Sequence, residues 1–138
     1  MATTAIDYKR THFEKPDLTQ IRGQPSFETL SQLIRELKAN AQCVHTNLGG
    51  GNLGHLGLVL TDAQYALIST ALFVRPTHPG PLLIAAGTTG PMSTVLKEQH
   101  KETLRSFHEV HNVEKSLKQQ IMAALEPQYL KAIRSRTT

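Results

Sequence analysis

Cysteine, tryptophan and long apolar runs are scarce or missing in this sequence of 138 residues, which has one Cys and no Trp. A single cysteine excludes an internal disulfide framework and a zinc site built on cysteines, and it is typical of a reducing compartment. The two uncharged stretches, 39–61 and 76–96, are interrupted by glycines and prolines, whereas a membrane-spanning helix needs about 20 mostly apolar residues. No secretory signal opens the chain. We therefore expect a cytoplasmic protein with no membrane partner.

Charge and apolar content are both modest. The chain has 15 Lys and Arg against 11 Asp and Glu, a net charge of +4, and 39% hydrophobic residues. This charge permits an RNA or acidic partner without requiring one. The length and composition predict one small domain.

Charged residues flank a glycine-rich centre. Residues 41–90 contain only Asp62 and Arg75 as charged side chains, yet they hold eight of the nine glycines. Prolines at 16 and 25 punctuate the start of the chain. We predict that residues 1–25 form an extended N-terminal arm, either laid on the domain or left mobile, and that 26–138 form the domain itself.

Apolar residues recur at helical spacing on both sides of this centre. Ser26 is a candidate N-cap for a helix over about 26–41. Thr61 and Gln64 form a capping box that predicts a second helix, about 62–69, with Tyr65 and Ile68 facing inward. From about residue 91 the helical pattern runs to the end.

Two positions indicate where this last helical stretch could be divided. His111-Asn112 marks a candidate break, and Pro127 is placed to start a further helix, because proline is tolerated in a first turn. The fold class predicted is mainly α: a single small domain of four to five helices, with a Gly-rich central loop and room for one short β-hairpin.

The glycine-rich centre is the main candidate site. Residues 49–54 match the G-x-G-x-x-G pattern, in which backbone amides cradle a pyrophosphate. However, neither a clear strand before it nor a helix directly after it is predicted, and a lone motif is weak. The segment is therefore either a fold-determining or assembly loop, or a ligand-binding loop. Its candidate residues are Gly49, Gly50, Gly51, Gly54, His55 and Gly57.

The sequence contains little evidence for a catalytic site or a metal site. His108 and His111 are three residues apart, whereas the zinc-protease motif H-E-x-x-H needs four. Cys43 falls at the end of the first predicted helix and not at a helix N-terminus, where thiols are activated, and we expect it to be a packed small side chain. The sequence predicts no enzyme, no catalytic residue, no metal and no cofactor.

A small basic cluster lies near the C-terminus. It consists of Lys131, Arg134 and Arg136. No aromatic residues alternate with these cations, as a stacking platform for single-stranded nucleic acid would require. Only weak, non-specific and salt-sensitive RNA binding is predicted there.

The central motif resembles a known family. The residues on which the resemblance rests are Asn47-Leu-Gly-Gly-Gly-Asn-Leu-Gly-His-Leu-Gly-Leu-Val-Leu-Thr-Asp-Ala-Gln-Tyr65. They resemble Gag-like, capsid-region polypeptides of copia-type LTR retrotransposons of the diatom and protist type. The resemblance continues through 36–41, 73–81, 100–102, 107–109, 113–117 and 129–130.

This resemblance implies a non-enzymatic structural protein: mainly helical, self-associating and assembling around element RNA into a virus-like particle. The lone Cys43 excludes the zinc knuckle of a full Gag, and the protease motif is missing. The chain looks like an N-terminal fragment of a longer Gag, or a truncated or domesticated copy. The alternative function is a small-ligand or nucleotide-binding module built on Gly49–Gly57.

Overall fold

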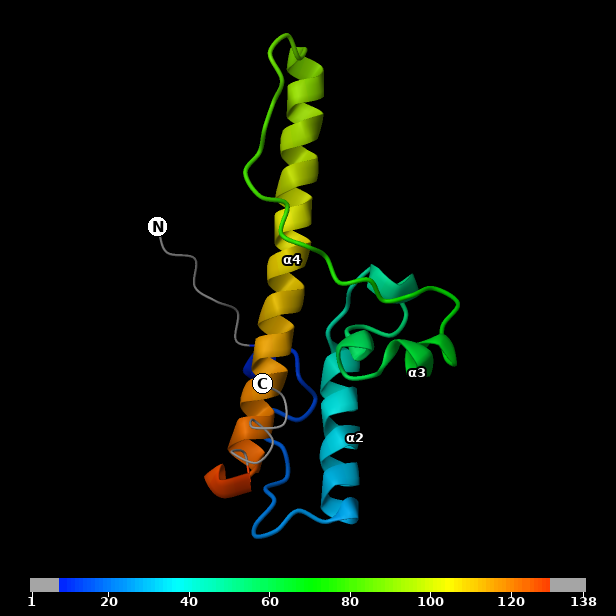
Figure 1. Ribbon diagram of the computed structural model, residues 1–138, viewed down its shortest axis with the longest axis vertical. Coiled ribbons are helices and arrows are strands. Elements are labelled where there is room, and N and C mark those ends of the chain that lie inside the picture. Colours follow the sequence, from blue (N-terminus) through cyan, green and yellow to red (C-terminus); the bar gives the residue numbers. More distant parts are fainter. Residues whose placement is uncertain (1–7, 130–138) are drawn as a thin grey trace.

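The computed structural model describes residues 8–129 and shows an elongated, mainly helical molecule (Figure 1). The four α-helices of this range are α1 (Tyr8–Thr11), α2 (Phe27–Cys43), α3 (Asp62–Ala66) and α4 (Gly90–Ala124). α4 forms the long axis, α2 lies beside its lower half, and α3 sits at the upper end of α2 (Figure 1). The mainly helical class is confirmed.

No β-hairpin forms within residues 8–129. The only strand-like pairing described there is an isolated parallel bridge between Ile21 and Leu125. Glycines and prolines leave the centre without two apolar runs long enough to pair as strands.

Helix α2 begins where the sequence predicts and ends two residues later. Ser26 accepts a hydrogen bond from the amide of Thr29, whose side chain bonds back to the Ser26 amide. This reciprocal capping satisfies two donors that the first turn leaves free. The inner face of α2 is formed by Leu33, Glu36, Leu37, Asn40 and Ala41.

Helix α4 is continuous over 35 residues, so the predicted break at His111-Asn112 is wrong. Thr89 caps its start, accepting from the Met92 amide, and a proline occupies the first turn. The helix holds together past residue 112 because Val110 and Val113 on either side of it are both buried. A further helical turn begins at Pro127, as predicted.

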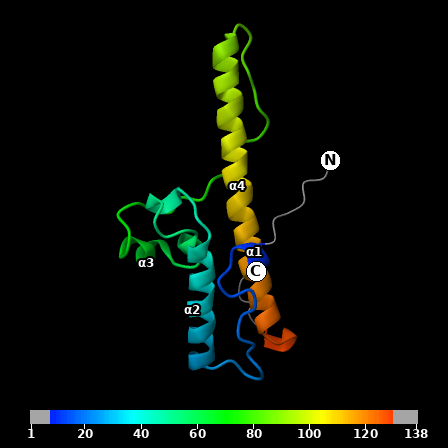
Figure 2. The ribbon, with the colours of Figure 1, turned by 180° about the vertical axis from the view of Figure 1, so that it is seen from behind.

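The described part of the N-terminal arm, residues 8–25, lies on the domain and completes the core. Four of its apolar residues are buried between the lower halves of α2 and α4: Tyr8, Phe13, Leu18 and Ile21. The arm also contains one helical turn, α1, and Figure 2 shows it crossing the space between the two long helices.

A buried polar network joins the arm to both long helices. Asn40 of α2 is fully buried; its Oδ1 accepts from the Lys15 amide at 2.8 Å, and its Nδ2 donates to the Gln120 Oε1 of α4 at 3.0 Å. Nδ2 also donates to the Lys15 carbonyl at 2.9 Å. Gln120 Nε2 donates to the carbonyls of Lys15 and Pro16, both at 2.9 Å.

Glu36 adds a buried charge to the same region. Burial by itself would raise the pKa of this carboxyl, but hydrogen bonds from Lys15 and Thr19 outweigh that effect and lower it. Lys15 Nζ lies 3.2 Å from Glu36 Oε2. The arm is therefore held by polar contacts as well as by apolar packing.

The upper half of α4 is covered on one side only, by an irregular segment that we call the strap, residues 74–89 (Figure 1). His100 Nε2 lies 2.7 Å from the Gly80 carbonyl, and His78 meets Phe107 edge-on at 5.2 Å between ring centroids. Arg75 forms an ion pair with Glu114. His100 is thus half-buried against the strap.

Candidate functional site

The glycine-rich loop folds into two short 3₁₀ turns between α2 and α3. They span Leu48–Gly50 and Leu56–Leu58. The loop closes over a small cluster of buried side chains, Leu56, Tyr65 and Phe73. Tyr65 thus faces inward as predicted, whereas Ile68 is 54% exposed and that prediction is wrong. Helix α3 ends at Ala66, one turn too early to turn Ile68 toward the cluster.

Two glycines allow aromatic rings to approach the loop backbone. The Tyr65 hydroxyl donates to the Gly49 carbonyl at 2.7 Å, and a Cβ at Gly49 would lie 2.0 Å from that hydroxyl oxygen. A Cβ at Gly57 would lie 2.2 Å from the Phe73 ring. The space that these glycines leave is therefore filled by the protein's own side chains.

Gly54 is required for a different reason, the close approach of the end of α2. Its φ is +53°, a left-handed conformation that favours glycine. A Cβ there would lie 2.3 Å from the carbonyl oxygen of Gln42 and 2.8 Å from that of Val44. The neighbouring His55 amide donates to the Ala41 carbonyl at 2.8 Å, which ties the loop to the helix end.

His55 is fully buried between this helix end and α4. Its Nδ1 lies 2.7 Å from the Val44 carbonyl, which can only accept, so Nδ1 carries the proton and donates. Its Nε2 has no hydrogen-bond partner among the described residues and lies 3.7 Å from Glu109 Oε1. Burial lowers the pKa of His55 more than Val44 and Glu109 raise it. The ring is neutral at pH 7, and its contact with Glu109 is not an ion pair there.

The loop does not have the form of a phosphate cradle. Such a cradle needs free amides at the start of a helix, but here the Gly51 amide donates to Leu48 and the Leu56 amide donates to Leu53. The turn that follows has three residues. Among the six candidate residues, Gly49, Gly54 and His55 are buried, Gly50 is exposed, and Gly51 and Gly57 are half-buried. The arrangement explains how the loop packs against α2 and over Tyr65 and Phe73.

The histidine pair and the cysteine likewise form no reactive cluster. His108 and His111 are exposed on α4, where the His111 ring stacks on Phe107. Over residues 8–129 no group of three or more His, Cys, Asp or Glu side chains is arranged to hold a metal ion. Cys43 is exposed, so its predicted packing is wrong: it is the last residue of α2 and lies off the buried face. Lys131, Arg134 and Arg136 lie outside the described residues.

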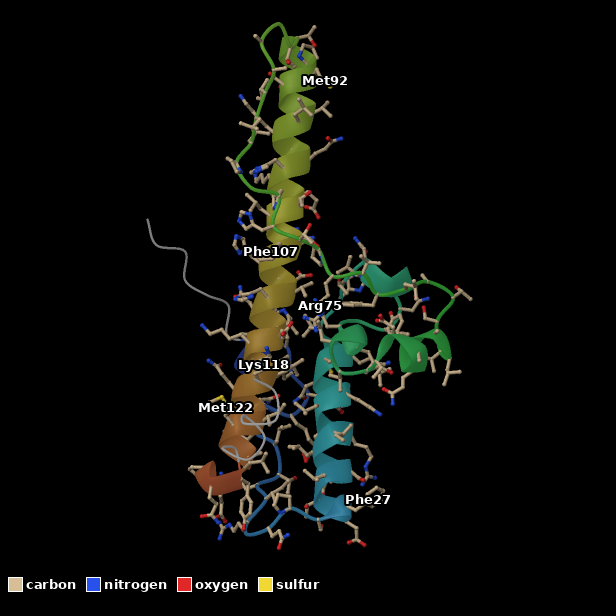
Figure 3. All side chains as sticks on the ribbon, in the orientation of Figure 1. Phe27, Arg75, Met92, Phe107, Lys118 and Met122 are labelled. Carbon is tan, nitrogen blue, oxygen red and sulfur yellow. The ribbon has the colours of Figure 1, made fainter. Side chains whose placement is uncertain are left out.

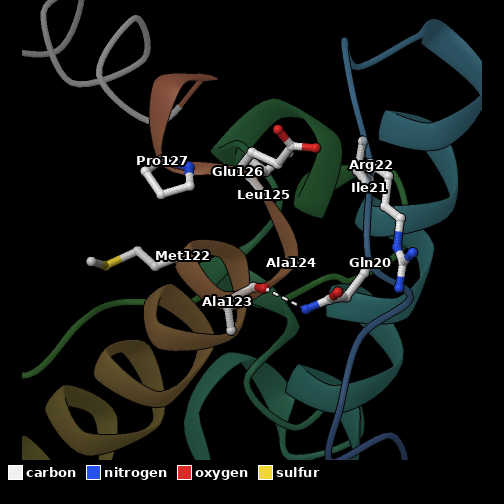
Figure 4. A pocket seen from close by; sticks show the side chains of 9 residues that line it. All are labelled: Gln20, Ile21, Arg22, Met122, Ala123, Ala124, Leu125, Glu126 and Pro127. Carbon is white, nitrogen blue, oxygen red and sulfur yellow. Dashed lines mark hydrogen bonds between the residues drawn. The ribbon is translucent and has the colours of Figure 1, made fainter.

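A cleft of about 460 Å³ lies where the arm meets the end of α4 (Figure 4). Its wall is held by a hydrogen bond from Gln20 Nε2 to the Ala123 carbonyl, at 3.2 Å. The one carboxylate lining it, on Glu126, accepts from the Gly23 amide at 2.6 Å. The side chains of Gln20 and Glu126 in this cleft therefore already have hydrogen-bond partners.

Exposed apolar side chains are the most prominent surface feature. At least thirteen large hydrophobic side chains are exposed in the described range, among them Ile68, which was predicted to face inward. They lie on the outer face of α2, around α3, along the strap and on α4: Phe27, Leu30, Ile34, Leu67, Ile68, Leu72, Val74, Leu82, Leu83, Ile84, Met92, Val95 and Met122. Large exposed apolar areas mark interaction surfaces.

In comparisons with known proteins, no family model matches this sequence, and no curated protein and no solved structure matches it. Within residues 8–129, no helix combines the length and the apolar character needed to cross a membrane.

Proposed function

We propose that this protein is a non-enzymatic assembly protein, a Gag-like capsid-region domain that acts by self-association. The observation that carries the proposal is the exposed apolar surface of α2, α3, the strap and upper α4. A monomer that kept this surface in water would forgo about 25 cal/mol for each Å² of apolar area that contact could bury.

The shape of the molecule supports the same function. The upper half of α4 projects beyond the end of α2 and is accompanied only by the strap (Figure 1). Such a projection adds little to the core, because its apolar side chains Met92 and Val95 remain half exposed. It does provide a long, regular surface for contact with other copies. Assemblies of identical subunits are built from such repeated contacts.

RNA enters this proposal as a weak and non-specific partner of the basic cluster Lys131, Arg134 and Arg136. Phosphate contacts by such a cluster weaken as salt rises. RNA would then raise the local concentration of protein copies, and the protein would not recognise a particular base sequence.

The test is light scattering behind size exclusion over a hundredfold range of protein concentration, at low and high salt, with and without RNA. We expect the mass to grow with concentration in the absence of RNA, and RNA to enhance this growth at low salt. A constant monomer mass over the whole range would refute self-association by this chain.

A further inference from the structure

Two apolar stripes at opposite ends of the molecule are left uncovered by the other residues that the structure describes. The first, which we call the α2 patch, lies on the outer face of α2 and includes Phe27, Leu30 and Ile34. Phe27 is 86% exposed and Ile34 45% exposed. The three residues are spaced by three and four, so they share one side of the helix. Figure 3 places Phe27 at the foot of the molecule, on the side away from α4.

The second stripe, the α4 patch, is formed by Met92 and Val95, and Figure 3 places Met92 near the other end of the molecule. They are 51% and 46% exposed. Each lies 18 residues, or five turns of helix, before a buried residue: Met92 before Val110 and Val95 before Val113. The side of α4 that forms the core below therefore continues upward, beyond the reach of α2, and there it is uncovered.

Charges beside the two patches have opposite signs. In the α2 patch, Lys38 lies one turn beyond the last apolar residue, and the cations Lys38 and Arg35 outnumber the one carboxylate beside the patch, Glu28. In the α4 patch, Glu98 follows Val95 by three residues. Lys38, Arg35 and Glu98 form no ion pair with another described residue. One patch is apolar and basic, and the other is apolar and acidic.

We propose that the α2 patch of one copy packs against the α4 patch of a second copy, with Lys38 and Arg35 beside Glu98 of that copy. This inference rests on the proposed function and names the surfaces that carry it. Charge complementarity selects the pairing, since two α2 patches or two α4 patches would bring like charges together. Lys101 lies two and a half turns from Met92, on the side of α4 opposite that residue.

The pairing has a consequence for the form of the assembly. The two patches are different surfaces, so a contact between two copies leaves one α2 patch and one α4 patch free. Such a head-to-tail contact continues into rings if the rotation closes and into filaments if it does not. A contact of a few helical turns is also small, below roughly 1,200 Å², which is the range of weak and transient interfaces.

The experiment uses charge reversal on the full chain, with sedimentation or light scattering at increasing concentration. Lys38→Glu and Glu98→Lys are each expected to raise the concentration needed for association by about tenfold, because each puts like charges in the contact. The matched control is Lys115→Glu, an exposed lysine in the lower half of α4 and outside both patches. It should associate as the unaltered chain does. Circular dichroism establishes that every variant is folded.

Mixing the two single variants tests the contact directly. The carboxylate introduced by Lys38→Glu would face the ammonium introduced by Glu98→Lys on the other variant. The unaltered Lys38 of the second variant would face the unaltered Glu98 of the first, so both kinds of contact regain opposite charges. We expect an equimolar mixture to recover association to within about threefold of the unaltered chain. The double variant that carries both substitutions should recover it alone.

Three results would overturn this pairing while leaving self-association intact: single variants that associate normally, a mixture that does not recover, or a Lys115→Glu control that weakens association equally. A monomeric unaltered chain would instead overturn the proposed function and the pairing together.

Discussion

Replacing Asn40 should reveal how strongly the arm is held to the two long helices. In Asn40→Ala, the Lys15 amide loses its acceptor and Gln120 Oε1 loses its donor. The Lys15 carbonyl keeps a partner, because Gln120 Nε2 still donates to it at 2.9 Å. Two buried groups without partners cost about 1–3 kcal/mol each. Packing around a fully buried side chain is lost as well, so we expect the free energy of unfolding to fall by about 3–5 kcal/mol in total.

The assay is urea unfolding followed by helical circular dichroism, which reports the free energy of unfolding for a small cooperative domain. Gln42→Ala is the control, because Gln42 is exposed on the same helix; it should change stability by less than about 0.5 kcal/mol. A loss below about 1 kcal/mol in Asn40→Ala would refute the argument that this network closes the core.

An aspartate at the same position separates hydrogen bonding from volume. Asn40→Asp keeps the size and can still accept from the Lys15 amide. Its other oxygen would face the Lys15 carbonyl and Gln120 Oε1, which also accept. A protonated carboxyl could donate there, so the loss of stability in Asn40→Asp should shrink as pH falls toward about 4, whereas the loss in Asn40→Ala should not. An equal pH dependence in both variants would contradict the assigned donors.

Two further predictions concern the glycine loop and its histidine. Gly54→Ala should lower the free energy of unfolding by about 3 kcal/mol or more, since its Cβ would meet two backbone carbonyls. Gly80→Ala, which is also at positive φ but in open space, should lower it by only about 1 kcal/mol. Similar losses in the two variants would show that the contact with α2 is not rigid. Because burial lowers the pKa of folded His55, the unfolded chain takes up the proton first. The contribution of His55 to the free energy of unfolding should therefore be complete above about pH 6.5 and should fall as the pH drops toward the pKa of the folded protein. His55→Gln should remove part of this fall in unfolding free energy between about pH 7.5 and 5.5, and an unchanged slope would contradict the burial of a neutral ring.

Local signals in the sequence predicted the helix starts well. Ser26 and Thr61 act as caps because the hydroxyl, the amides it accepts from and the returning side chain all lie within four residues. Tyr65 also faces inward as its helical position indicates. Such features depend on one turn of backbone, so they can be predicted without knowing what packs against the helix.

The errors arose where burial depends on distant segments. Ile68 follows the apolar pattern but is exposed, since α3 stops at Ala66 and nothing covers the next turn. His111-Asn112 suggests a break, yet burial of Val110 and Val113 keeps α4 continuous. Asn40 and Gln120 carried no signal at all, because 80 residues separate them and polar residues on a helix are ordinarily solvated.

For this protein the sequence alone determined the helical class and the caps of α2 and α3, because these follow from residue spacing and from hydrogen bonding within a few residues. Only the tertiary structure decided that His55 is sealed beside Glu109, that the glycines at 49, 54 and 57 admit neighbouring atoms, and that the apolar stripes of α2 and upper α4 stay uncovered. Exposure is a property of the whole arrangement. A helical stripe has the same pattern whether its partner lies in the same chain or in another.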